Sequence, residues 1–422
     1  MLRRTAILLT AAPAFLRASE VRFAPKGEGF ELLRDGRPYR IRGAGGTQAL
    51  EQLVAAGGNS IRCWSPPGKA TMDRAQDLGL TVMLGLPVGL PRHGFSYDDA
   101  AAVAKQRERV RNLVRDYREH PALLVYALGN EVEHHASDAQ RMQVWREMEQ
   151  LARLVKEEDP RHPVITVTAG WGRAVLTELR AMAPSLDAVG INTYGGMMRV
   201  AEAVKEQGWN KPWMVTEFGP RGHWEVAKTP WDLPIEDPSS TKADFYLAAY
   251  RRVENSSPAF LGAYVFLWGQ KQEKTHTWYG MFLPDGTPLD TVDAMTMAWT
   301  GRWPEKRAPR IESLDVVSVL RPGEPWLRLP PGARIRAKAA AVSHDSSPLA
   351  ITWDLRPDVS DNPSTGGDRE PSVEPIAGAI IHAVDDRCEV NLPAKPGNYR
   401  LFVYARNTHG KAATANRALR IE

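Results

Sequence analysis

Eight short apolar segments alternate with segments of helical periodicity, and this alternation is the feature that most constrains the fold. The apolar segments read as strands buried on both faces: Tyr39–Gly43, Ser60–Trp64, Leu80–Leu86, Leu123–Leu128, Val164–Thr168, Ala188–Asn192, Trp213–Thr216 and Leu261–Leu267. The helical segments are Gln48–Ala56, Lys69–Leu78, Asp98–Arg118, Asp138–Glu157, Ala174–Met182, Val200–Gln207, Ser240–Val253 and Thr291–Trp299. Eight strand–helix units predict a (β/α)₈ TIM barrel. A doubly wound open sheet is the alternative, but the sequence lacks the Gly-x-Gly-x-x-Gly turn expected after the first strand of such a sheet.

The segments that flank the barrel predict two further parts. Phe30–Tyr39 reads as a hairpin with its turn at Asp35-Gly36, and we expect it to close the base of the barrel. Composition changes at 303–309, and short alternating segments then replace the helical period. They predict a C-terminal immunoglobulin-like β-sandwich: Ala333–Ala341, Leu349–Leu355, Ala379–Val384, Tyr399–Tyr404 and Arg417–Ile421. The expected domains are therefore a barrel with its hairpin over 19–307 and a sandwich over 308–422.

The N-terminus has the pattern of a secretory signal. Arg3-Arg4 precede an apolar run from Ala6 to Leu16, and small residues follow the run. The run is too short to span a membrane. We expect residues 1–18 to be a signal peptide and the protein to be secreted or periplasmic. The alternative is an apolar N-terminal helix that stays in place. No other segment is apolar over enough residues to form a membrane span.

Bulk composition excludes several classes of protein. With 43% hydrophobic and 25% charged residues the chain is globular rather than disordered. The formal charge of +4 is spread over 422 residues without a Lys/Arg-rich run, so we expect no nucleic-acid partner. Cys63 and Cys388 fall in different expected domains, which argues against a disulfide. Nothing in the sequence defines an oligomeric state.

Two glutamates stand at the ends of apolar strands, where a carboxylate has no packing role. Leu123–Leu128 runs into Gly-Asn-Glu131, and Trp213–Thr216 runs into Glu217. In a barrel of parallel strands both fall at the carboxyl-end rim, where chemistry is done. Glycosidic bond cleavage requires such a pair, one carboxylic acid to protonate the leaving oxygen and one carboxylate to attack or to activate water. A solvated rim charge or a salt bridge is the alternative for either glutamate alone.

Other strand ends carry side chains suited to a sugar site. Arg62 would keep a carboxylate ionised, Tyr194 could donate to Glu217, and Asn130 could hydrogen-bond a sugar hydroxyl. Aromatic side chains such as Trp268 could carry a sugar ring. The further candidates for substrate binding are His93, Asn192, Trp64 and Trp171. Each of these could instead serve packing or a buried ion pair. The aromatic residues Trp224, Trp231, Trp278 and Tyr279 lie in long loops and suggest additional stacking subsites.

Two other hydrolase classes fit the sequence poorly. Glu131, Glu133, His134 and His135 cluster, but His-Glu-x-x-His is absent, and adjacent histidines do not share one ligand face. A serine hydrolase would need a Gly-x-Ser-x-Gly elbow, which is also absent. We therefore expect neither a metal nor an organic cofactor.

Together these motifs resemble the clan A glycoside hydrolases. The resemblance rests on Leu128-Gly-Asn-Glu131, Val215-Thr-Glu-Phe-Gly219, and Arg62, Tyr194 and Trp268 at their strand ends; it covers about residues 30–303. The catalytic barrels of families 2 and 5 are the most similar. The resemblance implies Glu131 as acid/base, Glu217 as nucleophile, Arg62 and Tyr194 as its supports, and Trp268 beside the cleavage point. It also implies retention of anomeric configuration, with the carboxyls ~5 Å apart.

The sequence departs from that clan in ways that leave the substrate open. Only a hairpin precedes the barrel, whereas family 2 enzymes carry β-domains there, and the segments 89–97 and 268–275 match no substrate pattern. We expect a retaining β-glycoside hydrolase of a β-glucan-like oligo- or polysaccharide. A transglycosylase of the β-glucanosyltransferase type would use the same residues. From another class, the chain could be a non-catalytic carbohydrate-binding protein.

Overall fold

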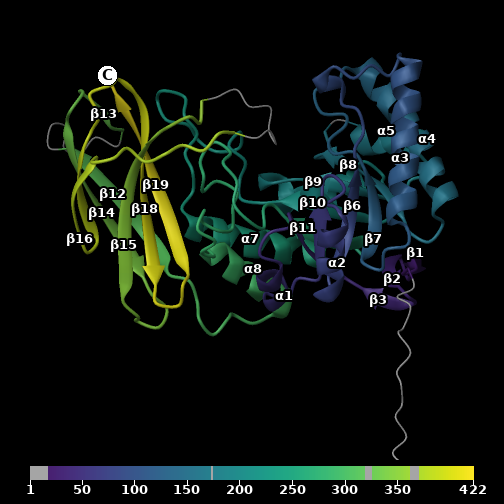
Figure 1. Ribbon diagram of the computed structural model, residues 1–422, viewed down its shortest axis with the longest axis horizontal. Helices are drawn as coiled ribbons and strands as arrows, with labels where there is room; N and C mark the ends of the chain where they lie inside the picture. The colour runs from purple at the N-terminus through teal and green to yellow at the C-terminus, as the bar shows by residue number, and fades with distance from the viewer. Residues whose placement is uncertain (1–17, 173, 319–325, 362–369) are drawn as a thin grey trace, which may run out of the picture.

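The computed structural model describes residues 18–172, 174–318, 326–361 and 370–422, as two parts that lie side by side (Figure 1). The expected signal peptide, apart from its last residue, lies outside the described residues. Among the residues described, no helix is long and apolar enough to cross a membrane.

The first part is a closed barrel of eight parallel strands in the order β10-β11-β4-β5-β6-β7-β8-β9. The strands are β4 (Ile41–Gly45), β5 (Ser60–Cys63), β6 (Thr81–Leu86), β7 (Leu123–Leu128), β8 (Val164–Ala169), β9 (Ala188–Asn192), β10 (Trp213–Phe218) and β11 (Phe260–Val265). The helices that surround them are α1 (Leu50–Ala55), α2 (Lys69–Asp77), α3 (Ala100–Tyr117), α4 (Asp138–Glu158), α5 (Val175–Met182), α6 (Val200–Glu206), α7 (Ser239–Glu254) and α8 (Asp290–Thr300). The predicted TIM barrel is confirmed, strand by strand.

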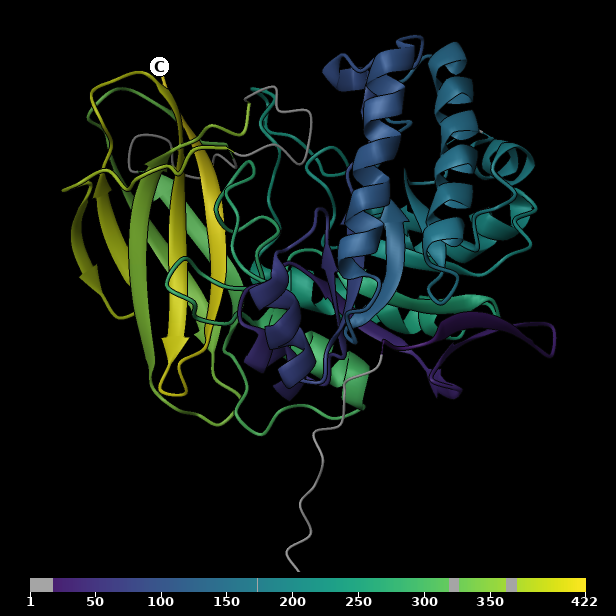
Figure 2. The same cartoon turned by 45° about the vertical axis from the view of Figure 1, so that its right-hand side comes forward.

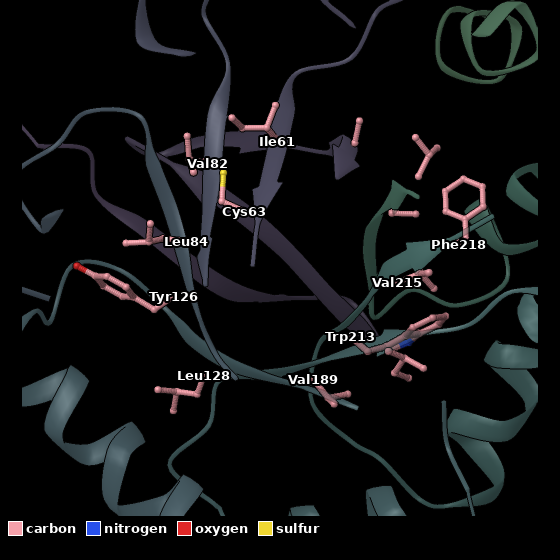
Figure 3. Close-up of a cluster of buried hydrophobic side chains, with 14 of the residues drawn as sticks. Ile61, Cys63, Val82, Leu84, Tyr126, Leu128, Val189, Trp213, Val215 and Phe218 are labelled. Atoms are coloured by element: carbon pink, nitrogen blue, oxygen red, sulfur yellow. The ribbon is translucent and has the colours of Figure 1, made fainter. Parts of the chain in front are cut away.

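The strands read as apolar runs because both of their faces are buried. Every residue of β6, β7, β10 and β11 is buried. One face packs against the helices, where Figure 3 shows Ile61, Val82 and Leu84 with their neighbours around the sheet. The other face fills the barrel interior. This two-sided core fixes the strands and hence the positions of the residues that follow them.

A three-stranded antiparallel sheet closes the amino-terminal end of the barrel. It consists of β1 (Val21–Lys26), β2 (Gly29–Arg34) and β3 (Arg37–Tyr39). Val21 and Leu32 pack into the cluster that fills the barrel interior. The predicted hairpin is therefore confirmed as β2–β3, and β1 extends it by a strand that the sequence did not reveal.

The second part is a sandwich of two four-stranded sheets, in the orders β12-β14-β17-β16 and β13-β19-β18-β15. Its strands are β12 (Arg310–Ser318), β13 (Arg328–Leu329), β14 (Arg334–Val342), β15 (Leu349–Pro357), β16 (Ile380–Val384), β17 (Arg387–Asn391), β18 (Gly397–Asn407) and β19 (Ala412–Ile421). The predicted β-sandwich is confirmed, and β12, β13 and β17 are additions. Its immunoglobulin-like character stays a prediction.

The sandwich packs against the barrel beside α7 and α8, as both views show (Figures 1 and 2). Polar groups join the two parts: the backbone N–H of Thr414 donates to Ser239, and Lys411 pairs with Asp293 at 2.5 Å. The loop between β11 and α8 also contacts the sandwich, through a hydrogen bond of 2.8 Å between His276 and Tyr404. The sandwich therefore contacts a loop that begins at the carboxyl-end rim of the barrel.

Candidate active site

Glu131 and Glu217 both lie at the carboxyl-end rim, and both line one cavity of about 570 Å³. Glu217 is the last residue but one of β10, where the strand still fixes the direction of its side chain. Glu131 follows β7 by three residues and has a φ of 51°, in the left-handed region that few non-glycine residues adopt. The fold thus brings together the two carboxyl groups that the sequence placed on separate strands.

The carboxylate of Glu217 is held at both oxygens. Oε1 accepts hydrogen bonds from Arg62 Nη1 and Trp64 Nε1, each at 2.7 Å, and Oε2 accepts one from the Tyr194 hydroxyl at 2.9 Å. Arg62 is only 1% exposed, so its charge lies in the interior and is compensated there by Glu217. Three donors, one of them a cation, fix the orientation of a charged carboxylate.

Glu131 lies in a contrasting environment. Its Oε1 accepts one hydrogen bond, from Asn192 Nδ2 at 2.8 Å. Burial raises the pKa of the Glu131 carboxyl, and the nearby charge of Glu217 raises it further. The hydrogen bond from Asn192 opposes that rise only in part. A carboxyl in such a place retains its proton to higher pH than a solvated one.

Asn130 and Asn192 connect the two glutamates through Arg62. Asn130 Oδ1 accepts from Arg62 Nη2 at 2.5 Å and from Asn192 Nδ2 at 3.1 Å. Asn192 Oδ1 accepts from Arg62 Nη1 at 3.2 Å and from the Thr216 hydroxyl at 2.9 Å. A continuous chain of hydrogen bonds therefore runs from Glu131 through Asn192 and Arg62 to Glu217.

A second cavity of about 540 Å³ adjoins the first at Glu131. The side chains of Glu131, Tyr194 and Trp224 line both cavities. Of the residues predicted for substrate binding, Trp64, His93 and Asn130 line the first cavity. Trp171 and Asn192 line the second. Arg62 lies beneath the rim and acts on the site through its hydrogen bonds.

The structure does not bring Trp268 to either cavity of the candidate site. Its ring is 1% exposed, packs on Phe282 and Trp299, and donates from Nε1 to the Ala49 carbonyl, so it lines neither cavity. The aromatic side chain in its place is Phe266, which lines the first cavity. Because β11 ends at Val265, the regular alternation of side chains stops before either residue. Sequence spacing alone therefore did not show which of the two faces the site.

Several lining residues were not predicted as site residues. Arg92, Lys271 and Glu273 line the first cavity, and His135, His223 and Glu225 line the second. They come from long loops, where periodicity gives no side-chain direction. Among the aromatic loop residues, Trp224 reaches both cavities. Trp278 and Tyr279 are buried, and Trp231 packs against Trp326 of the sandwich.

The histidines beside Glu131 do not form a metal site. His134 and His135 lie ring against ring, with centroids 3.9 Å apart. Burial lowers the pKa of His134 to about 4. Across the described part of the chain, no group of three His, Cys, Asp or Glu side chains is arranged to hold a metal ion. Cys63 and Cys388 are both buried free thiols.

Comparison with known proteins agrees with this geometry. Residues 68–225 match the family model described as glycosyl hydrolases family 2, TIM barrel domain. The barrel is similar to those of glycoside hydrolase family 2. The resemblance to clan A is thereby confirmed. No curated protein matches the chain in sequence.

Solved structures of β-glucuronidases and a β-galacturonidase share this fold. β-Glucuronidase 2 of Bacteroides uniformis, covalently bound to cyclophellitol-6-carboxylate aziridine, is 16% identical, with a TM-score of 0.51 over 95% of this chain and 48% of that one. The β-galacturonidase of Eisenbergiella tayi bound to galacturonate is 16% identical, with a TM-score of 0.52 over 67% of this chain and 54% of that one. The β-D-glucuronidase of Dictyoglomus thermophilum is also 16% identical, with a TM-score of 0.51 over 68% of this chain and 55% of that one. The chain spans about half the length of these proteins.

Proposed function

We propose that the protein is a retaining β-glycosidase in which Glu217 is the nucleophile and Glu131 is the acid/base. The observation that carries the proposal is the difference between the two carboxyls in one cavity. Glu217 is held by Arg62, Trp64 and Tyr194, as an attacking carboxylate requires. Glu131 has a raised pKa, as a general acid requires.

The reaction would proceed in two steps. A carboxylate oxygen of Glu217 attacks the anomeric carbon while Glu131 gives its proton to the departing glycosidic oxygen. Glu131, now ionised, then takes a proton from water as the water oxygen attacks the same carbon and releases Glu217. The charge of Glu217 raises the pKa of Glu131, and this charge is lost while Glu217 is bonded to the sugar. The pKa of Glu131 is then lower, as the second step requires of a general base.

The substrate and the location of the protein are further parts of this proposal. A β-glucan-like oligo- or polysaccharide remains the substrate that we propose, and the protein would act outside the cytoplasm if residues 1–18 are a signal peptide. A cavity on each side of Glu131 also leaves space for a sugar acceptor in place of water. That space makes transglycosylation the second candidate function.

A panel of aryl β-glycosides tests the proposal. It should include glucosides, galactosides, mannosides, glucuronides and galacturonides, with product configuration followed by NMR. We expect release of aryl alcohol from at least one sugar, with a β-configured first product, and its loss in Glu217→Gln. An α-configured first product would contradict retention. Sugar binding without turnover of any glycoside would instead identify a carbohydrate-binding protein.

A further inference from the structure

The two cavities differ in which parts of the candidate site they contain. Glu131, Tyr194 and Trp224 line both, whereas Glu217 and Asn130 line only the first. The second cavity is built by the segments that follow β7, β8, β9 and β10. It therefore extends the site away from the nucleophile, on the side of Glu131.

The chemistry of the reaction gives this asymmetry a meaning. A general acid protonates the oxygen of the leaving group, so the leaving group lies on the acid's side, while the sugar that is attacked lies at the nucleophile. We propose, resting on the function proposed above, that the second cavity is the subsite for the leaving group and for acceptors. In it an uncharged sugar ring would stack on Trp171 and Trp224.

The walls of the second cavity are fixed by contacts within the protein. A Cβ atom at Gly196 would lie 2.7 Å from the ring of Trp171, so the glycine lets that ring lie against the backbone. Trp224 is 56% exposed, and its ring meets the ring of Tyr194 edge-on at 5.4 Å. Two tryptophans therefore line the same cavity, and aromatic rings of this kind are what sugar stacking requires.

Glu225 joins two of the loops that form this cavity. Its Oε2 accepts from the backbone N–H of Gly195, in the segment after β9, at 2.8 Å. The same oxygen accepts from the N–H of Gly222, in the segment after β10, at 2.7 Å. The position of Trp224 is therefore tied to that of Tyr194 by hydrogen bonds within the protein.

The charges around the second cavity favour a neutral ligand. Among the described residues that line it there is no lysine or arginine, and its carboxylates are Glu131 and Glu225. Burial lowers the pKa of both His134 and His223 to about 4, so both are uncharged at pH 7. The first cavity, in contrast, contains Arg92 and Lys271. An anionic ring would be repelled by the carboxylate of Glu225 and by ionised Glu131, and no lysine or arginine among the described lining residues would attract it.

A trapped glycosyl-enzyme isolates this subsite. A 2-deoxy-2-fluoro-β-glycosyl fluoride of the sugar identified by the aryl glycoside panel would form a long-lived ester with the 422-residue protein and fill only the first cavity. Reactivation is then followed in buffer and with increasing glucose or glucuronate as acceptor. We expect saturable acceleration by glucose and little by glucuronate. The ratio of acceptor-driven to water-driven rate should fall about five- to tenfold in Trp171→Ala.

Variants and controls separate the possible failures. Trp224→Ala, a change at an exposed ring, provides a second test should Trp171→Ala fold poorly. Trp303→Ala is the matched control, because Trp303 is 39% exposed and lines neither cavity. Acceptor effects that are unsaturable, or equal in wild type and both cavity variants, would overturn the subsite. Stronger acceleration by glucuronate would overturn its preference for neutral sugars. Failure of every fluoride to label the protein would instead contradict the proposed function.

Discussion

The hydroxyl of Tyr194 donates to Oε2 of Glu217 at 2.9 Å. Among the described residues it is the one side chain that hydrogen-bonds this oxygen. Arg62 and Trp64 both hold the opposite oxygen, Oε1. Together with the two donors to Oε1, Tyr194 therefore fixes the direction from which an oxygen of Glu217 meets the anomeric carbon.

Removing this hydroxyl should slow the reaction without unfolding the protein. A hydrogen bond to a charged group contributes about 1.5–3 kcal/mol, so Tyr194→Phe should lower kcat/KM on an aryl glycoside roughly 10- to 100-fold. Tyr399→Phe is the matched control, because its hydroxyl bonds the Lys395 carbonyl within the sandwich and should leave kcat/KM unchanged. Wild-type kcat/KM in Tyr194→Phe would show that the carboxylate is oriented by other groups.

The raised pKa of Glu131 predicts the alkaline limb of the pH profile. As general acid Glu131 must hold a proton, so kcat/KM should fall as pH rises through its pKa, which burial and Glu217 place above the ordinary value of 4.5. Carbon-detected NMR titration should find this pKa lower in Glu217→Gln, where the repelling charge is gone. A pKa that is unchanged in that variant would contradict electrostatic coupling between the two carboxyls.

Glu133 should make the protein less stable as pH rises. It is buried; its Oε1 accepts from the Ala169 N–H at 2.6 Å, and Oε2 has no hydrogen-bond partner among the described residues. Burial raises its pKa from 4.5 to about 7. The folded state therefore binds the proton more tightly than the unfolded state, and the free energy of unfolding should fall by about 3 kcal/mol between pH 4.5 and 7.

Denaturant unfolding of Glu133→Gln tests that expectation. The amide keeps the bond to Ala169 but does not ionise, so the variant should lack this part of the pH dependence. It should be more stable than wild type at pH 8 and close to wild type at pH 4.5. Parallel stability curves for the two proteins from pH 4.5 to 8 would contradict the buried, protonated state of Glu133.

The sequence could predict the position of a site residue where that residue lies on a strand or directly after one. Strands buried on both faces produced apolar runs, so the barrel and the places of Glu217, Arg62 and Asn192 could be predicted from their spacing. Glu131 could be placed because it follows β7 directly. Trp268 could not, because β11 ends at Val265 and the next residues follow no period. Lys271 and Glu225 lie in long loops, where only the three-dimensional structure shows which cavity they line.

The contact between the sandwich and the β11–α8 loop should affect substrate binding. Tyr404 of the sandwich shares hydrogen bonds with His276 at 2.8 Å and with Asp354 at 3.0 Å. The same loop carries Lys271 and Glu273 into the first cavity. Tyr404→Phe should therefore raise KM severalfold with a smaller change in kcat, since the glutamate pair is untouched. An unchanged KM would show that the sandwich does not position this loop.

The assignment of Glu217 as nucleophile is tested most directly by azide rescue of Glu217→Ala. The variant should have almost no turnover of an aryl β-glycoside, because no carboxylate remains to form the glycosyl-enzyme. Azide, which fits the space left by the side chain, should restore turnover and yield the α-glycosyl azide. Absence of rescue, or a β-glycosyl azide as product, would contradict Glu217 as the nucleophile.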